Sequence, residues 1–211
     1  MDNSLAIKDS DLYFKNTEIE NLMLMYSSAL KTLENKISVI NNEFRINNSY
    51  NPIEHVKTRI KSPKSILGKL KKKGLEPTYE NIIENINDIA GMRIVCSFIP
   101  DIYTIVNIIE NFDDIRIIER KDYVNKPKSS GYSSYHMIIE VPIQLSNGTK
   151  YVKAEIQIRT VAMDFWASLE HKINYKYDGN VSKSVLRDLK SCAKIVSRLD
   201  NKMLELSTKR N

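Results

Sequence analysis

This sequence of 211 residues is poor in the features that define several common protein classes. Cysteine occurs only twice, as Cys96 and Cys192, and neither belongs to a Cys-x-x-Cys pair. A disulfide framework and a zinc or redox motif of that kind are therefore excluded, and we expect two buried thiols. No apolar run is long enough to cross a membrane, and residues 1–13 show no continuous apolar stretch behind a basic start. We accordingly expect a cytoplasmic protein with no membrane partner.

Two familiar signatures of phosphate chemistry are missing as well. Gly68-Lys69 resembles the end of a P-loop, but Leu70 follows the lysine and Pro63 stands where the first glycine belongs. A P-loop enzyme is therefore excluded. The His-Asp pair of metal-dependent phosphohydrolases is also absent, which excludes hydrolysis by that machinery; the residues after the three histidines are Val56, Met137 and Lys172.

Glycine and proline are scarce, with six of each, and no linker rich in them divides the chain. Hydrophobic residues at 42% and charged residues at 27% are ordinary for a soluble globular protein, so we expect one domain spanning 1–211. Apolar residues at steps of three and four predict long amphipathic helices at about 17–45 and 182–207. Such helices either cover a sheet or pair between subunits.

The middle of the chain predicts a mixed β-sheet flanked by helices, an α/β fold of the α+β kind. Asn147-Gly148 between two alternating runs is a strong hairpin signal. Thr160 is the expected cap of a helix with a buried stripe of Ala162, Phe165, Trp166, Leu169 and Ile173. The expected strands are 55–61, 89–98, 115–120, 135–143 and 151–158, and the other expected helices are 64–73, 78–87 and 101–112.

Positive charge is concentrated in one segment of a chain whose net charge is +6. The segment between His55 and Leu75 contains no acidic residue. It contains eight basic residues: Lys57, Arg59, Lys61, Lys64, Lys69, Lys71, Lys72 and Lys73. Such a block suits RNA, a membrane surface, a polyphosphate or simply a solvated helix face. Ser62-Pro63 starts the expected helix within it, where phosphate groups are favoured.

The last expected strand has one apolar face and one polar face. Lys153, Glu155, Gln157 and Arg159 alternate onto the polar face, as they would on an edge strand exposed to water. The strand leads directly into an aromatic-rich helix, which favours a cleft instead. Asp88 precedes a neighbouring strand, and two carboxylates on neighbouring strands can hold Mg²⁺ together with nucleotide phosphates and water.

The segment 126–132 has the composition of a plain surface loop, but it also contains what a nucleotide site requires. Lys126 and Lys128 supply ammonium groups, Gly131 permits close backbone approach, and Tyr132 offers a ring for a base to stack on. His136 follows shortly afterwards, and a lone histidine is more often structural than catalytic.

Four separated motifs stand out together: Arg59-Ile60-Lys61-Ser62-Pro63-Lys64-Ser65-Ile66, Asp88-Ile89-Ala90-Gly91-Met92-Arg93, Gly131-Tyr132-Ser133-Ser134-Tyr135-His136 and Glu155-Ile156-Gln157-Ile158-Arg159-Thr160. In this order, and over about residues 50–178, they resemble the synthetase domain of the RelA/SpoT family. The continuation from Ala162 to Lys172 resembles the single-domain small alarmone synthetases, the RelQ/RelP-like (p)ppGpp synthetases, in particular.

The resemblance implies a nucleotidyltransferase-like sheet and transfer of the β,γ-pyrophosphate of ATP to the 3′-hydroxyl of GDP or GTP, giving AMP and ppGpp or pppGpp. On the donor side it implies that Arg59 and Arg93 sandwich the adenine, with Lys61, Ser65 and Lys69 on the phosphates. At the centre it implies Mg²⁺ on Asp88 and Glu155, with Glu155 as the general base. On the acceptor side it implies that Tyr132 stacks on guanine, Lys128 and His136 lie near the acceptor phosphates, and Gln157 and Arg159 organise the site.

The sequence departs from the family at two places. Ser133 stands where arginine or glutamine is usual and Ser130 where asparagine is common, so the preference among GMP, GDP and GTP stays open. His55-Val56-Lys57-Thr58 replaces the Phe-Val-Thr-Gly that helps form an allosteric product pocket in one branch, so product activation stays open too. The family also implies a homo-oligomer, a tetramer. Two alternatives remain: an RNA-binding or regulatory synthetase-like module, and transfer of pyrophosphate to another acceptor such as RNA or an adenosine nucleotide.

Overall fold

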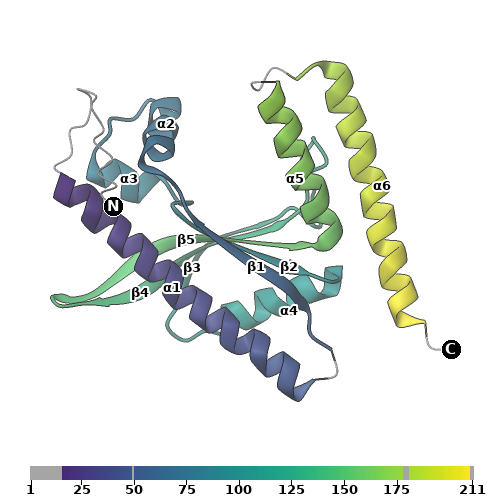
Figure 1. Cartoon of the computed structure of the whole chain (residues 1–211), viewed down its shortest axis with the longest axis horizontal. Coiled ribbons are helices and arrows are strands. Elements are labelled where there is room, and N and C mark those ends of the chain that lie inside the picture. Colours follow the sequence, from purple (N-terminus) through teal and green to yellow (C-terminus); the bar gives the residue numbers. More distant parts are fainter. Residues whose placement is uncertain (1–15, 49, 178–180, 210–211) are drawn as a thin grey trace, which may run out of the picture.

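The computed structural model describes residues 16–48, 50–177 and 181–209 (Figure 1). Residues 1–13, where the sequence predicts no targeting signal, lie outside this range. None of the helices described is both long and apolar enough to cross a membrane. The elements are α1 (Asn16–Asn47), β1 (Ile53–Ile60), α2 (Pro63–Lys73), α3 (Tyr79–Asn85), β2 (Ala90–Cys96), α4 (Ile99–Glu110), β3 (Arg116–Asp122), β4 (Tyr135–Leu145), β5 (Gly148–Thr160), α5 (Val161–Lys176) and α6 (Lys183–Thr208).

The five strands form one mixed sheet in the order β1-β2-β5-β4-β3. β2 and β5 are parallel, and the other neighbouring pairs are antiparallel. The predicted hairpin joins β4 to β5 with Leu145 paired to Gly148, whose φ of 121° suits a glycine. β5 therefore lies at the centre of the sheet, and the edge-strand interpretation of its polar face is wrong.

One face of the sheet is apolar and packs against α1 and α4. The alternation predicted for β5 is confirmed, because Val152, Ala154, Ile156 and Ile158 are all buried. Helix α1 crosses this face and buries Tyr26, Leu33 and Ile37 at helical spacing, as predicted (Figure 1). Full burial of each such large side chain is worth about 1.5–3 kcal/mol, so this face supplies the main core.

Helix α2 starts and ends where the local sequence dictates. The Ser62 hydroxyl accepts a hydrogen bond from the backbone N–H of Ser65, and Pro63 occupies the first turn, where its missing N–H costs nothing. Gly74 ends the helix in the left-handed conformation, with φ of 68°. These caps fix the direction in which the lysines of α2 point.

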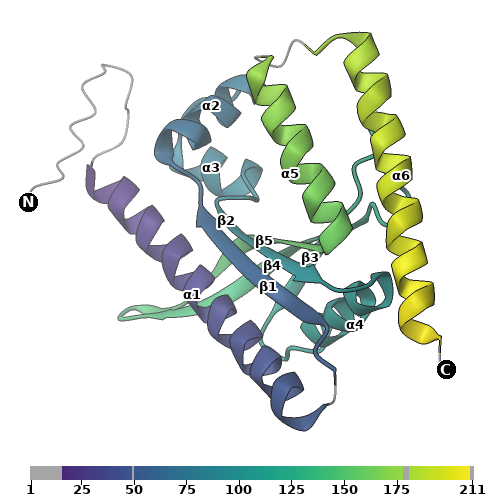
Figure 2. The same ribbon diagram turned by 45° about the vertical axis from the view of Figure 1, so that its right-hand side comes forward.

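Helices α5 and α6 lie side by side, away from α1 (Figure 2). Thr160 caps the start of α5 as predicted, because the backbone N–H of Met163 donates to the Thr160 hydroxyl at 3.2 Å. The expected buried stripe of α5 is only partly right. Trp166 is buried, but Phe165 and Leu169 are 60% and 41% exposed, because α5 packs against β5 and α6 along one narrow side.

The apolar stripe of α6 is likewise only partly covered. Leu189 is buried, whereas Leu186, Leu199 and Met203 are exposed, because one side of the helix alone contacts the rest of the chain. The expectation of two buried thiols holds for Cys96 in β2 but is wrong for Cys192, which is exposed on α6.

Candidate active site

The polar face of the sheet gathers the predicted site residues through strand register. Gln157 of β5 lies opposite Arg93 of β2 on one side and His136 of β4 on the other. Two residues earlier, Glu155 lies opposite Gly91, and Gly91 in turn lies opposite Arg59 of β1. Because residues paired across strands share a face, residues from four motifs line one surface.

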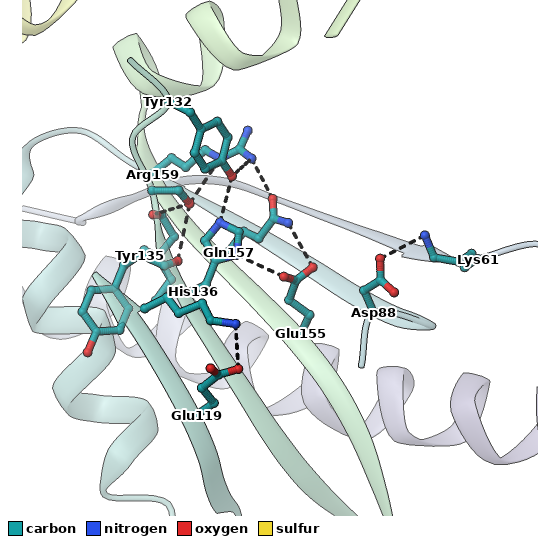
Figure 3. Close-up of polar contacts among 12 residues, drawn as sticks. Lys61, Asp88, Glu119, Tyr132, Tyr135, His136, Glu155, Gln157 and Arg159 are labelled. Atoms are coloured by element: carbon teal, nitrogen blue, oxygen red, sulfur yellow. Dashed lines mark hydrogen bonds and ion pairs between the residues drawn. The ribbon is translucent and has the colours of Figure 1, made fainter. Parts of the chain in front are cut away.

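The residues predicted for the acceptor side form a continuous hydrogen-bond network around Glu155 (Figure 3). Its Oε1 is 3.0 Å from Nδ1 of His136, and its Oε2 accepts from the Gln157 amide at 3.0 Å. Nε2 of His136 lies 2.8 Å from the Tyr132 hydroxyl, which accepts from Arg159 at 2.7 Å. In this arrangement Nδ1 of His136 faces the Glu155 carboxylate, which accepts hydrogen bonds only, and Nε2 of the same ring faces the Tyr132 hydroxyl.

The network keeps the Glu155 carboxylate ionised. Burial acts to raise the pKa of Glu155, but the hydrogen bond and charge of His136 and the hydrogen bond from Gln157 outweigh it, so the pKa lies below its usual value. The negative charge of Asp88 opposes this lowering, which places the second carboxylate within electrostatic reach. At neutral pH Glu155 is therefore a proton acceptor.

Arg159 is the most enclosed cation of the network. It is buried, and besides Tyr132 it donates to Gln157 at 2.7 Å, to the Ser134 hydroxyl at 3.3 Å and to Asp164 at 3.1 Å. These partners hold the planar guanidinium in one orientation. Arg159 is therefore better suited to position its neighbours than a lysine would be.

Two cations predicted for the donor side are organised around Asp88, just before β2. Lys69 of α2 approaches Oδ1 at 2.8 Å and Lys61, just after β1, approaches Oδ2 at 2.9 Å. Burial acts to raise the pKa of the Asp88 carboxyl, but the hydrogen bonds and charges of these two lysines outweigh it and hold the pKa below its usual value.

The other predicted donor residues lie close by without joining this cluster. Arg59 is exposed, and Arg93 is its diagonal neighbour on the same sheet face, at a spacing of roughly 7–8 Å that a flat ring with contacts on both sides would fill. Ser65 is exposed in the first turn of α2, where its hydroxyl lies 2.9 Å from that of Ser62.

The loop between β3 and β4 places Tyr132 against α5 and α6. Gly131 has a φ of 96° and sits so close to α6 that a Cβ there would overlap the Cβ of Ala193. Tyr132 packs with the small cluster around Trp166 and Leu189. Nζ of Lys128 lies 5.1 Å from the centroid of the Tyr132 ring, so an exposed ammonium group stands beside the ring.

Comparison with known proteins identifies the group to which this fold and site belong. Residues 58–180 match the family described as "Region found in RelA / SpoT proteins". GTP pyrophosphokinase YwaC of Bacillus subtilis is 50% identical over 97% of both chains.

The chain belongs to the RelA/SpoT family.

Solved structures agree with this membership. Small alarmone synthetase 2 of B. subtilis is 50% identical, with a TM-score of 0.82, over 90% of this chain and 98% of that one. Small alarmone synthetase 1 of B. subtilis, bound to its product pppGpp, is 37% identical with a TM-score of 0.85, over 91% and 97%. The same synthetase bound to AMPCPP is 35% identical with a TM-score of 0.78, again over 91% and 97%. The predicted fold class and family are confirmed.

The divalent metal implied for RelA/SpoT synthetases has suitable donors here. Among the described residues no three acidic, histidine or cysteine side chains form a ready metal cluster, so the protein alone offers an incomplete set. Glu155 on β5 and Asp88, just before the adjacent strand β2, are carboxylates whose pKa values are lowered, and a hard cation takes such oxygens together with phosphate and water oxygens. The residues therefore fit a metal that binds with the nucleotide.

Sequence reasoning did not single out Asp164, although it stands in the RelA/SpoT motif after β5. Its carboxylate is buried and contacts both Arg93 and Arg159. Its position five residues after Arg159, in the first turn of α5, was the available signal. Only the packing of α5 against the sheet reveals the second contact, to Arg93 of β2.

Proposed function

We propose that this chain is a (p)ppGpp synthetase that transfers the β,γ-pyrophosphate of ATP to the 3′-hydroxyl of GDP or GTP. The observation that carries the proposal is the register that brings one residue of each of the four motifs, namely Arg59, Arg93, His136 and Glu155, onto one face of the sheet. Its family membership and its 50% identity to a GTP pyrophosphokinase agree with this activity.

On the donor side, Arg59 and Arg93 hold the adenine between their guanidinium planes, which stack on aromatic rings as ammonium groups do not. Lys61, Ser65 and Lys69 hold the phosphates. Both lysines contact Asp88 in this structure, so they already lie beside the carboxylate that would hold the metal ion. Positive charge at the start of α2 and its N-terminal N–H groups favour the same anion.

On the acceptor side, Tyr132 stacks on the guanine, and Lys128 and His136 lie near the acceptor phosphates. Glu155 removes the proton of the 3′-hydroxyl, whose oxygen attacks the β-phosphorus of ATP. The bond from that phosphorus to the oxygen bridging it to the α-phosphate breaks, and AMP leaves. Gln157 and Arg159 hold Glu155 and Tyr132 in place through the hydrogen bonds described above.

Mg²⁺ would be held by Asp88 and Glu155. When bound, it would neutralise charge on the phosphates during transfer. For Lys61 and Lys69 this implies a change of partner, because the two oxygens of Asp88 that they contact would be shared with the cation.

The test is incubation of the purified protein with ATP and Mg²⁺ and, separately, GMP, GDP, GTP, ADP or a short RNA, with the products resolved. AMP together with a 3′-pyrophosphorylated guanosine nucleotide is expected. Absence of product with every guanosine acceptor would refute the proposal. Product with ADP or RNA alone would support the alternative acceptor, and the same panel determines the preference among GMP, GDP and GTP.

We also propose that the protein is a homotetramer in the cytoplasm; the exposed apolar side chains of α6 support assembly, because such a stripe is rarely left in water. The side chains are Leu186, Ile195, Leu199, Met203 and Leu206. Light scattering on the eluting protein should give a mass near four chains, and a monomer mass would refute this assembly.

RNA remains a second candidate partner because Lys64, Lys71, Lys72 and Lys73 stay exposed on α2, apart from the lysines at Asp88. RNA affinity that falls steeply with salt, and that survives replacement of Lys61 and Lys69, would support an RNA-regulated synthetase.

A further inference from the structure

Asp164 lies at the junction of the donor and acceptor halves. A single oxygen, Oδ1, accepts from NH1 of Arg93 at 2.9 Å and from NH1 of Arg159 at 3.1 Å. The carboxylate side chain is only 12% exposed, so these two charge-assisted hydrogen bonds are largely shielded from water. One acidic group thus joins cations that come from different strands, β2 and β5.

The two arginines depend on this contact to different degrees. Arg159 has three further hydrogen-bond partners, in Tyr132, Ser134 and Gln157. The Nε of Arg93 is buried without a partner among the described residues, so its bond to Asp164 is the contact that fixes the guanidinium. Loss of the carboxylate would release Arg93 and leave two guanidinium groups facing each other.

We propose that Asp164 is a positioning residue that orients the adenine-side Arg93 and the acceptor-side Arg159 with one carboxylate, so that both nucleotide sites depend on it. This inference rests on the proposed function, because it takes Arg93 as part of the ATP site and Arg159 as part of the guanosine site. Asp164 itself contacts neither reacting atom; it acts through the two arginines.

The sign of the expected effect separates positioning from simple electrostatics. Removing a negative charge makes the site more positive, and charge alone would therefore tighten the binding of anionic nucleotides. Loss of orientation has the opposite effect, because a guanidinium stacks and donates well only when its plane is fixed. Weaker binding after removal of Asp164 would therefore report positioning.

The test compares Asp164→Asn with Asp200→Asn as the matched control. Asp200 is also a buried aspartate, on α6, but it accepts a hydrogen bond from the Thr160 hydroxyl at 2.6 Å and, in the part of the chain that the structure describes, forms no ion pair with an arginine of the site. We expect Asp164→Asn to raise KM for ATP and KM for the guanosine acceptor by about tenfold each, the size of one lost charge-assisted hydrogen bond, with a smaller change in kcat. Asp200→Asn should leave both KM values within about twofold of wild type.

Asp164→Glu provides a variant that keeps the charge and the folded state but moves the carboxylate. We expect it also to weaken both sites. In an Arg93→Ala background, Asp164→Asn should add little to the loss at the ATP site while still raising KM for the acceptor, because one arm of the contact is already gone.

Calorimetric affinities for AMPCPP and for GDP make the result independent of turnover. Loss of both affinities in Asp164→Asn supports the inference even if the wild-type protein makes no alarmone, an outcome that would refute the proposed function alone. Unchanged or tighter binding of either nucleotide, wild-type binding in Asp164→Glu, or a fall in kcat with both KM values intact would overturn the inference.

Discussion

The two halves of the proposed active site, the acceptor side and the donor side, differ in how completely their side chains are held by hydrogen bonds. On the acceptor side, Tyr132, His136, Glu155, Gln157 and Arg159 form a closed chain of hydrogen bonds, and Arg159 is buried. On the donor side, long cationic side chains converge on the Asp88 carboxylate or remain exposed, as Arg59 does. The acceptor half is therefore preorganised, whereas the donor half must rearrange when phosphates and a cation arrive.

The difference follows from the elements that carry each half. The acceptor residues stand on the central strand β5 and its neighbour β4, and α5 and α6 close them in on one side. Most of the donor residues stand on or just after the edge strand β1 and on α2, and only Arg93 stands on the inner strand β2. Preorganised groups gain more per contact because little conformational entropy is lost on binding. Substitutions in the acceptor half should therefore act mainly on kcat or on KM for the acceptor. Substitutions in the donor half should act mainly on the affinity for ATP.

The largest effect is expected for Glu155→Gln. The amide keeps the size and most hydrogen bonds but cannot accept the 3′-hydroxyl proton, so turnover should fall by about 10²–10⁴-fold. AMP release measures turnover, and calorimetry should still detect both nucleotides. Glu140→Gln, on the same face of the sheet near Arg116, is the control and should keep its activity. Near-normal turnover in Glu155→Gln would refute its role as the base.

Lys69→Met probes the donor half. Its ammonium group, 2.8 Å from Asp88, is only partly buried and is free to change partner, so its loss should raise KM for ATP by about tenfold. KM for the acceptor should change by less than twofold. Lys72→Met, an exposed neighbour on α2, is the control. An equal rise in both KM values would erase the proposed contrast between the halves.

Tyr132→Phe tests whether the acceptor half acts as a connected network. The ring stays, but Nε2 of His136 loses its partner and Arg159 loses one acceptor, so kcat/KM for the guanosine acceptor should fall by about five- to tenfold. Tyr123→Phe, the ring packed against Tyr132, is the control. If Tyr132→Phe raised KM for ATP to the same extent, the network would extend into the donor half.

Gly131→Ala should loosen the acceptor loop. The residue has a φ of 96° and a new Cβ would overlap Ala193, so we expect a loss of about 1–3 kcal/mol in the free energy of unfolding, with a higher KM for the acceptor. Denaturant unfolding measures the loss. In the Gly131→Ala protein, adding Ala193→Gly should recover the stability that was lost through the overlap. It should not recover the stability that was lost because alanine disfavours the positive φ at residue 131. No recovery would show that α6 does not set the loop position.

The smallest effect concerns pH. The folded pKa of Asp88 lies below its usual value, so its ion pairs contribute stability that is complete above the usual carboxyl range and is lost as pH falls through the folded pKa. The free energy of unfolding should therefore decline below about pH 4, near the usual pKa of an aspartate. In Lys69→Met the decline should be smaller and should end at a higher pH, because the folded pKa of Asp88 then lies nearer its usual value. An identical profile for both proteins would show that Lys69 does not hold the Asp88 pKa down.

The sequence alone was sufficient for the strands, most helix bounds and the polar alternation of β5, because these depend on local periodicity, caps and turn residues. Ser62-Pro63 and Gly74 delimit α2, and Asn147-Gly148 joins the hairpin. The four motifs also indicated the family, and they predict which side chains form the site. Their proposed roles in binding and catalysis are still predictions that need the experiments above.

The tertiary structure decided what the local patterns could not. Periodicity identifies an apolar helix face but not its neighbour, so Phe165, Leu169 and Cys192 were expected to be buried and are exposed. Strand order placed β5 at the centre of the sheet rather than at its edge. The shared contact of Asp164 with Arg93 and Arg159 joins residues up to 71 positions apart, and only the packing of α5 against the sheet brings them together.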